Sequence, residues 1–243
     1  MPFTPCHSVA VLPFARSKYL SATGLIIGTM TPDFEYFFRM DVKGIYGHTV
    51  LGLFYFDLPV TIFLAFIFHL VVKKNLIDNL PEFLQSRFLE IRDSDFVGYV
   101  KEHKLDFLIS VILGAATHII WDGFTHRRGL FVQILPGLYE GTIDFRGMHV
   151  PVWYALQHIS TIVGAGILGV YILMMKPKAG TYNRPGLLYW ILVIVIVAVI
   201  TFARMQRPVD NEKMVLIVIT MIASFCIAIT ILGLIPFFRR RSA

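Results

Sequence analysis

The sequence predicts an all-α polytopic membrane protein with about five transmembrane helices, short N-terminal helices and an interfacial amphipathic helix. Of its 243 residues, 56% are hydrophobic, and the mean hydropathy is +0.68. The apolar residues gather into long blocks, several of which reach the ~20 residues that a bilayer-spanning helix needs. No ten-residue segments alternate with period two, as the strands of a membrane barrel would, so helices must satisfy the backbone in lipid.

Five apolar blocks are long enough to span a bilayer. They are Thr49–Val72, Leu105–Phe124, Val152–Met175, Gly186–Ala203 and Met214–Phe238. A sixth block, Tyr19–Met30, is too short to be counted as a span, but Gly24 and Gly28 within it are four residues apart and favour close packing on a neighbouring helix. Ala165 and Gly169 predict the same for the third span.

The polar segments before the first span contain several ionisable residues. Thr4 is suited to cap a short helix whose first turns carry His7. Pro32 disfavours a helical conformation for the residue before it, so we expect a turn at residues 31–36. This turn would place Asp33 and Glu35 at the membrane edge, among aromatic residues.

Two longer polar connections follow. Within residues 73–104, apolar residues recur at helical spacing, which predicts an amphipathic helix on the membrane surface. Its apolar side would carry Leu80, Phe83, Leu84, Phe88 and Ile91, and its polar side Glu82, Gln85, Glu90 and Arg92. Residues 130–151 form a loop that is either a lid over a site or a plain connector.

The end of the second span carries the most informative motif. His118, Asp122 and His126 are four residues apart and fall on one stripe of a helix. Two imidazoles and a carboxylate on one face are a donor set for Zn²⁺ or a mixed N/O metal site. The alternative is that His118 bonds a neighbouring helix while Asp122 pairs with Arg127 or Arg128. Ionisable groups inside a span are expensive and usually functional, which favours the site.

Five crossings in alternation place residues 1–48, 126–151 and 204–213 on one side of the membrane. Candidate ligands from four separate segments converge there, whereas His69 and His103 lie on the opposite side. We therefore expect a divalent metal, zinc, with Asp33, His48, His118 and Asp122 as the core ligands. His7, His126 and His158 are expected as further ligands or as partners of the ligands.

These residues carry a resemblance. Pro5-Cys-His7, Pro32-Asp33, Gly47-His48 and Thr117-His118-x-x-x-Asp122 resemble membrane-bound metal-dependent hydrolases over residues 1–165. The order of ligands is also similar to that of zinc-dependent phospholipase C and the related single-strand nucleases, in which a zinc cluster activates water against a phosphodiester. That family has a second His-x-x-x-acid pair. Here Trp153 and Ile162 stand four residues beyond His149 and His158, so a complete three-metal cluster is not supported.

The resemblance implies a hydrolase acting at the membrane boundary on a phosphodiester or related bond, with a lipid-linked substrate. Glu35 is the candidate general base outside the ligand set. The alternative is a non-enzymatic protein that binds or transports metal ions, for which Asp57 gives mid-membrane support and the last two spans give none. In a third interpretation, the polar residues only tie helices together. The net charge of +6 is scattered at helix ends, which argues against nucleic acid as a partner.

We expect a single membrane domain over residues 1–243, in which residues 1–165 carry the site and residues 166–243 are mainly scaffold. Basic residues close to the spans, especially Arg239–Arg241, place the C-terminus in the cytoplasm. The site would then face outward from a bacterial cytoplasmic membrane. The sequence predicts no oligomeric state.

Overall fold

The computed structural model describes residues 3–180, 182, 185–208 and 213–235. They form two compact units. Unit 1 comprises Met1–Asp33, Tyr46–Ile62 and Lys104–Met174, and unit 2 comprises Phe34–Ile45, Phe63–His103 and Met175–Ala243. The expected single domain, with its site part at residues 1–165 and its scaffold part at residues 166–243, stays a prediction. The two units observed are interleaved along the chain.

Five helical segments within the described residues are long and apolar enough to cross a membrane, which confirms the predicted fold class. They are Leu53–Asp78, Lys104–Thr125, Val152–Met174, Leu187–Met205 and Lys213–Leu234. The first is continuous but not uniform. It runs through a π-turn (Leu53–Asp57), α3 (Leu58–Ile67), a second π-turn (Phe68–Val72) and α4 (Lys73–Asp78).

In unit 1, the short helix α1 (Ala22–Gly28) packs along the long helix α7 (Lys104–Thr125), and a 3₁₀ helix (Thr4–Phe14) packs against α7 and α10 (Val152–Met174). α1 is too short to span a bilayer, as predicted. A Cβ atom at Gly28 would lie 2.6 Å from the carbonyl oxygen of Val111, and one at Gly114 would lie 2.4 Å from that of Leu25. The expected close packing through glycine is therefore confirmed for Gly28 and also for Gly24, where a Cβ would lie 2.9 Å from the carbonyl oxygen of Phe107.

The same expectation is wrong for the third span. A Cβ atom at Gly169 would meet nothing within 4 Å, and Ala165 is exposed. Instead, Gly164 is the close-packed glycine of α10, because a Cβ there would lie 2.8 Å from the Cβ of Cys6. The spacing of small residues alone does not identify which face of the helix is covered by a neighbour.

Two local predictions near the N-terminus are also wrong. Residues 31–36 belong to a helix, α2 (Thr31–Arg39), and not to a turn. Pro32 is tolerated because it lies in the first turn, where a backbone N–H has no helical partner. Thr4 begins the 3₁₀ helix, but it does not cap it: Phe3 occupies the N-cap position, and the Thr4 hydroxyl donates to Asp33.

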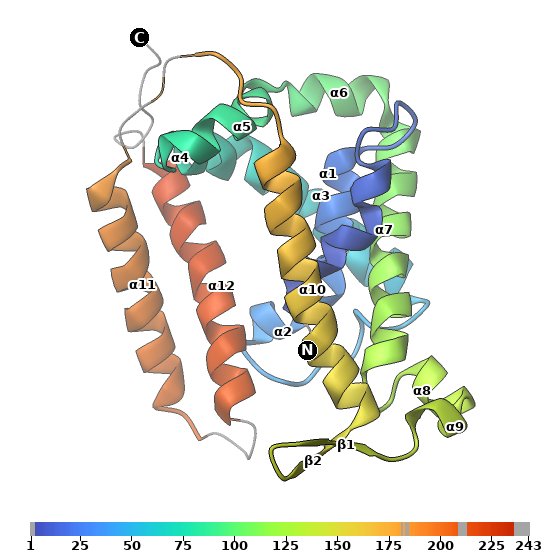
Figure 1. The fold of residues 1–243 in the computed structure, drawn as a ribbon. Coiled ribbons are helices and arrows are strands. Elements are labelled where there is room, and N and C mark those ends of the chain that lie inside the picture. Colours follow the sequence, from blue (N-terminus) through green and yellow to red (C-terminus); the bar gives the residue numbers. More distant parts are fainter. Residues whose placement is uncertain (1–2, 181, 183–184, 209–212, 236–243) are drawn as a thin grey trace. The chain divides into compact units, whose positions relative to one another are not determined.

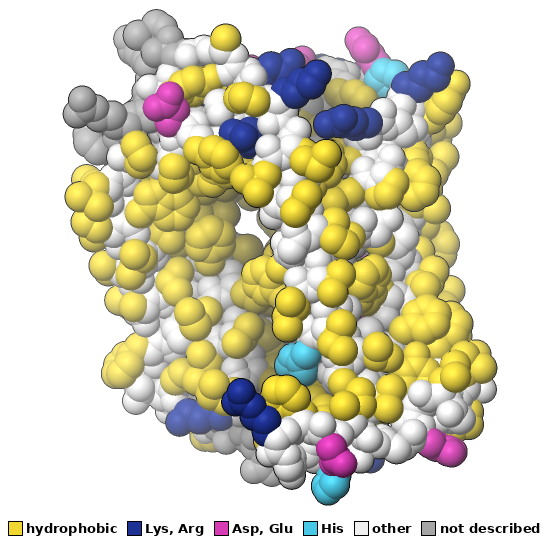
Figure 2. Space-filling view, viewed as in Figure 1, with side chains coloured by type: hydrophobic (Ala, Val, Ile, Leu, Met, Phe, Trp, Pro, Cys, Tyr) yellow, Lys and Arg dark blue, Asp and Glu magenta, His cyan; other side chains and the backbone are white. Residues whose placement is uncertain are grey.

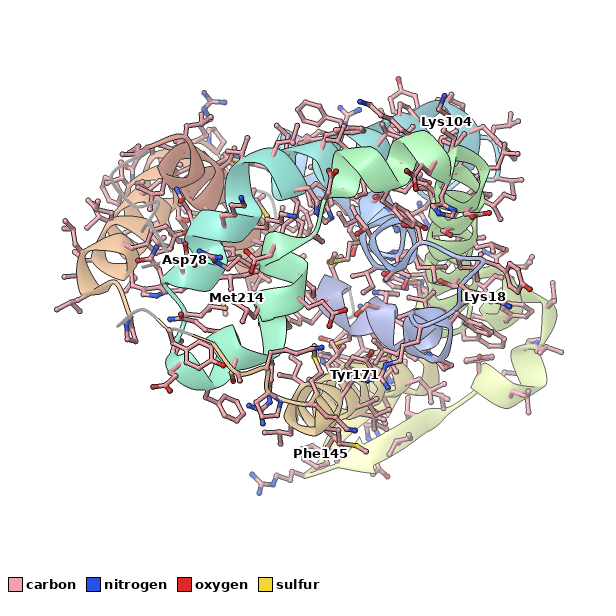
Figure 3. All side chains as sticks on the ribbon, turned by 90° about the horizontal axis from the view of Figure 1, so that it is seen from above. Lys18, Asp78, Lys104, Phe145, Tyr171 and Met214 are labelled. Atoms are coloured by element: carbon pink, nitrogen blue, oxygen red, sulfur yellow. The ribbon has the colours of Figure 1, made fainter. Side chains whose placement is uncertain are left out.

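In unit 2, α11 (Leu187–Met205) and α12 (Lys213–Leu234) run side by side in both ribbon views (Figures 1 and 3). Their shared core contains Tyr189, Val193, Ala228 and Leu232. Unit 2 also contains α5 (Glu82–Asp93) and α6 (Phe96–Glu102). The basic residues Arg239–Arg241, on which the predicted orientation depends, lie outside the described residues.

The predicted amphipathic helix is present as α5, but two of its polar residues do not face water. Gln85 is buried and donates to the carbonyl oxygen of Leu80 at 2.6 Å. Arg92 pairs with Asp78, which lies at the end of α4 (labelled in Figure 3), with 2.5 Å between Nε and Oδ1. Polar contacts therefore fasten α5 to the end of the first span.

The segment between α7 and α10 is more ordered than a loop. It contains α8 (Leu130–Ile134), α9 (Pro136–Tyr139) and a hairpin of two antiparallel strands, β1 (Thr142–Phe145) and β2 (Met148–Pro151). The two-residue turn of the hairpin is Arg146-Gly147, with φ of 49° and 81°. Positive φ at both central residues matches the right-handed twist of the strands.

The outer surface of α10 is apolar along much of its length (Figure 2). Ile159 and Ile162 on this helix are 53% and 72% exposed. Large exposed apolar side chains along a helix of this length fit lipid better than water. The protein is therefore an integral membrane protein.

Candidate metal centre

Four residues of unit 1 bring a donor atom to one point: Asp33, His48, His118 and Asp122. These four atoms lie within 4.8 Å of one another. Asp33 is in the first turn of α2, and His48 is in the turn that precedes the first span. His118 and Asp122 stand one turn apart near the end of α7. The cluster can therefore hold a metal ion.

The spacing of the donor atoms is informative. His48 Nε2 lies 3.4 Å from Asp33 Oδ1 and 3.4 Å from Asp122 Oδ2. His118 Nε2 lies 3.7 Å from the same oxygen of Asp33 and 3.4 Å from that of Asp122. These distances exceed those of ordinary hydrogen bonds, which are about 2.7–3.2 Å.

Donors around one tetrahedral zinc ion, each about 2.05 Å from the metal, lie about 3.3 Å from one another. Donors around an octahedral ion at the same radius would lie about 2.9 Å apart. Four of the six edges between the donor atoms are 3.4–3.7 Å long. The cluster thus has room for one ion bound by two nitrogens and two oxygens.

One ring nitrogen of His118 is occupied by the backbone. Its Nδ1 lies 2.6 Å from the carbonyl oxygen of Thr29, the residue that ends α1. A carbonyl can only accept, so Nδ1 carries the proton and Nε2 presents its lone pair to the cluster. Because α1 and α7 pack through their glycines, this carbonyl is held against the ring. Such a partner fixes the orientation of a metal-binding histidine.

Asp33 is arranged in a similar way. Its Oδ2 accepts a 2.6 Å hydrogen bond from the Thr4 hydroxyl, which leaves Oδ1 facing the cluster. Among the described residues, Asp33 Oδ1 and His118 Nε2 are buried and have no hydrogen-bond partner. A buried acceptor without a partner is costly, so a cation between these two atoms would remove an energetic penalty.

The two carboxylates make the centre of the cluster favourable for positive charge. Burial opposes a charge on His48, but the carboxylates of Asp122 and Asp33 outweigh burial and raise the pKa of His48 to about 10. Burial also disfavours the charged form of Asp33, yet His118 and His48 lower the pKa of Asp33 below its usual value. His48 has the most exposed side chain of the four, at 26%.

The second oxygen of Asp122 contacts two further histidines that were predicted as ligands or partners. His7 Nε2 lies 3.0 Å from Asp122 Oδ1, and its ring stacks on that of His118. His126 Nδ1 lies 3.4 Å from the same oxygen, and burial lowers the pKa of His126. Although α7 ends at Thr125, His126 keeps a helical backbone bond to Asp122. Both histidines can orient the carboxylate.

The cluster does not include two other predicted residues. His158 lies on an exposed part of α10, with its ring against that of Tyr154. Glu35 is buried, and its Oε1 accepts from the backbone N–H of Ile45 at 2.8 Å and from Arg39 at 3.1 Å.

Sequence reasoning missed the contributions of Thr4 and Thr29. Thr4 was assigned to a helix cap, although its hydroxyl binds Asp33. Thr29 acts through its carbonyl oxygen, which every residue type has, so no side-chain pattern could have revealed it. The only available signal was the glycine spacing in α1, which predicts the close helix contact that brings this carbonyl to His118.

The chain belongs to the DUF4184 family, described as a domain of unknown function, whose model matches residues 1–234. No curated protein and no solved structure matches the chain. The family assignment covers both units, but it does not assign an activity. The similarity to metal-dependent hydrolases and to zinc-dependent phospholipase C therefore stays a prediction.

Proposed function

We propose that this protein is a membrane-bound metal-dependent hydrolase that cleaves a phosphodiester or related bond at the membrane boundary, with zinc as its metal. The observation that carries the proposal is the convergence of two carboxylate oxygens and two imidazole nitrogens in one cluster, with nitrogen–oxygen distances of 3.4–3.7 Å. Mg²⁺ and Ca²⁺ prefer all-oxygen sites, whereas this donor set suits zinc.

The chemistry of the donors supports hydrolysis. A divalent metal held here would lower the pKa of a bound water toward neutrality and polarise a substrate oxygen. Asp33 and Asp122 supply the negative charge that offsets the cation. His48, with the most exposed side chain of the four, is on the edge that a substrate can approach.

The position of the cluster along the spans supports a substrate at the membrane boundary. His48 precedes the first residue of the first span, Leu53, by five positions. His118 and Asp122 lie in the last two turns of α7, which ends at Thr125. The donors therefore lie near the ends of their spans, which is the level of lipid head groups and their phosphates. A lipid-linked phosphodiester is the substrate class that fits this level.

A second candidate function is metal binding without catalysis. Catalytic zinc sites usually have three protein ligands and one position for water, whereas four protein donors are typical of closed structural sites. The observed cluster already offers four donors. Hydrolysis would require the coordination to expand or one donor to move away, and metal binding alone would require neither.

The proposal is tested with Asp122→Asn, which is nearly isosteric but lacks the charge. We expect loss of a ligand to weaken metal affinity by more than the 10–100-fold that loss of a ligand's partner costs. The assays are elemental analysis, melting in detergent, and product release from a phosphodiester panel with added Zn²⁺ or Mn²⁺. His158→Gln is the control, since this exposed residue is outside the cluster.

The enzymatic function is supported if the wild type hydrolyses a substrate and Asp122→Asn abolishes this activity. The variant must also leave the melting temperature of the metal-free protein unchanged. A variant as active as wild type would remove Asp122 from the mechanism. A wild type that binds stoichiometric metal but hydrolyses nothing supports the non-enzymatic function. Glu35→Gln distinguishes a catalytic base from a structural residue. If Glu35 is the base, the variant has a lower kcat at unchanged metal content; if Glu35 only holds Arg39 and Ile45, the variant has a changed melting temperature.

A further inference from the structure

The β-hairpin between α7 and α10 has two chemically different faces. Paired residues of antiparallel strands point to the same side. Ile143 pairs with Val150 and Phe145 with Met148, so one face carries only these four apolar side chains. The other face carries the pairs Thr142–Pro151 and Asp144–His149. Asp144 and His149 form an ion pair 2.5 Å long, and both side chains are more than 70% exposed.

The apolar face is exposed. Ile143, Phe145 and Met148 are 47%, 58% and 58% accessible within the described part of the chain. The preceding helices add to this surface, because α8 and α9 expose Leu130, Ile134 and Leu138. A group of large exposed apolar side chains marks an interaction surface.

The chain itself indicates what this surface contacts. The segment joins the ends of two spans, α7 and α10, so both of its ends are held at the membrane surface. β2 ends at Pro151 and α10 begins at the next residue, so the hairpin joins this lipid-facing helix without a linker. Figure 3 shows the hairpin, with Phe145 labelled, beside α10, which carries the labelled Tyr171.

The charged residues of the segment fit the same arrangement. Arg146 is at the tip of the hairpin, with its guanidinium group 5.7 Å from the Phe145 ring. Arg127 and Arg128 follow the end of α7 and are exposed. Arginine beside an apolar face is suited to lipid phosphates, whereas the Asp144–His149 pair on the opposite face is suited to water.

We propose that the hairpin is an interfacial membrane anchor, with Ile143, Phe145, Met148 and Val150 buried in the bilayer surface and the Asp144–His149 face in water. The bilayer is the partner of this surface. The anchor holds the ends of α7 and α10 at one depth, and the proposal is independent of any activity at the metal centre.

The test uses nitroxide labels on cysteines introduced one at a time into the full chain, which is reconstituted in lipid bilayers. Phe145→Cys and Met148→Cys report the apolar face, and Asp144→Cys and His149→Cys are their matched neighbours on the other face. The labelling of the unmutated chain through Cys6 and Cys226 is subtracted. Relaxation by oxygen, which partitions into lipid, is compared with relaxation by a water-soluble nickel chelate.

We expect the oxygen-to-nickel ratio to alternate with period two, high at Phe145 and Met148 and low at Asp144 and His149. Equal access of the nickel chelate to all four labels would overturn the anchor. Protection of the Phe145 and Met148 labels from both relaxants would also overturn it, because protein would then cover the face. Dipolar broadening in that case would identify the cover as a second copy of this chain.

Discussion

Both units bury polar side chains, but they satisfy them in different ways. In unit 2, Arg92 meets Asp78 at 2.5 Å, and the Asn75 amide donates to the carbonyl oxygen of Leu232 at 2.9 Å. Each is a donor and an acceptor at hydrogen-bond distance. In unit 1, the imidazole nitrogens and carboxylate oxygens of the cluster are 3.4–3.7 Å apart, which is longer than an ordinary hydrogen bond.

The difference shows that buried charge alone does not identify a site. A guanidinium is permanently protonated and has no lone pair to offer, so a carboxylate beside it can only form a structural pair. An imidazole has a lone pair, and a carboxylate at a slightly longer distance leaves room for an ion between them. The type of partner and the spacing separate a tie between helices from a metal centre.

The largest expected effect is on metal content. A His118→Ala, Asp122→Ala double variant removes two of four donors, and we expect bound metal to fall from about one ion per chain to near zero. Elemental analysis of protein purified without chelator measures this. Equal metal content in wild type and variant would mean that the cluster of unit 1 binds no metal and only ties helices together, as the polar contacts of unit 2 do.

The next effect is on packing. In Gly28→Ala, the new Cβ would lie 2.6 Å from a backbone oxygen of α7, so α1 must move, at a cost of about 3 kcal/mol. The movement also draws the Thr29 carbonyl away from His118, so metal affinity should fall as well. Thermal unfolding and metal titration measure the two losses. Gly169→Ala, where a Cβ meets nothing within 4 Å, is the control and should change neither.

The smallest effect is expected in unit 2. Asp78→Asn replaces a charged partner of the half-buried Arg92. Stability should fall by only about 2 kcal/mol, because Asp93 still accepts from the guanidinium. Metal content should stay at the wild-type level. A variant that melts normally but has lost its metal would erase the distinction between the two units.

The fold was largely predictable because the length and composition of a membrane helix are read directly from sequence. All five spans were recognised, with ends that differ by a few residues, and the i, i+4 spacing of His118 and Asp122 correctly placed them on one side of α7. Counting the membrane crossings predicted that Asp33 and His48 lie on the same side of the membrane as that pair.

The details that failed depend on tertiary contacts. Pro32 was taken as the sign of a turn, yet it fits the first turn of α2. The hairpin at residues 142–151 was expected as a loop, because four-residue strands are too short to show a period. Gly164 and Gly169 look alike in sequence, and only the approach of Cys6 distinguishes them. The hydroxyl of Thr4 reaches Asp33 across 29 positions, which local patterns do not contain.

The origin of the four donors has a consequence for biogenesis. Asp33 and His48 enter the membrane region with the first part of the chain, but His118 and Asp122 are synthesised only after the first span and the whole of α5 and α6. A nascent chain that ends before α7 therefore has half a site, with Asp33 and His48 but without the two donors of α7. Metal capture must follow the docking of α7 on α1, so a loaded centre reports that this part of the protein has assembled.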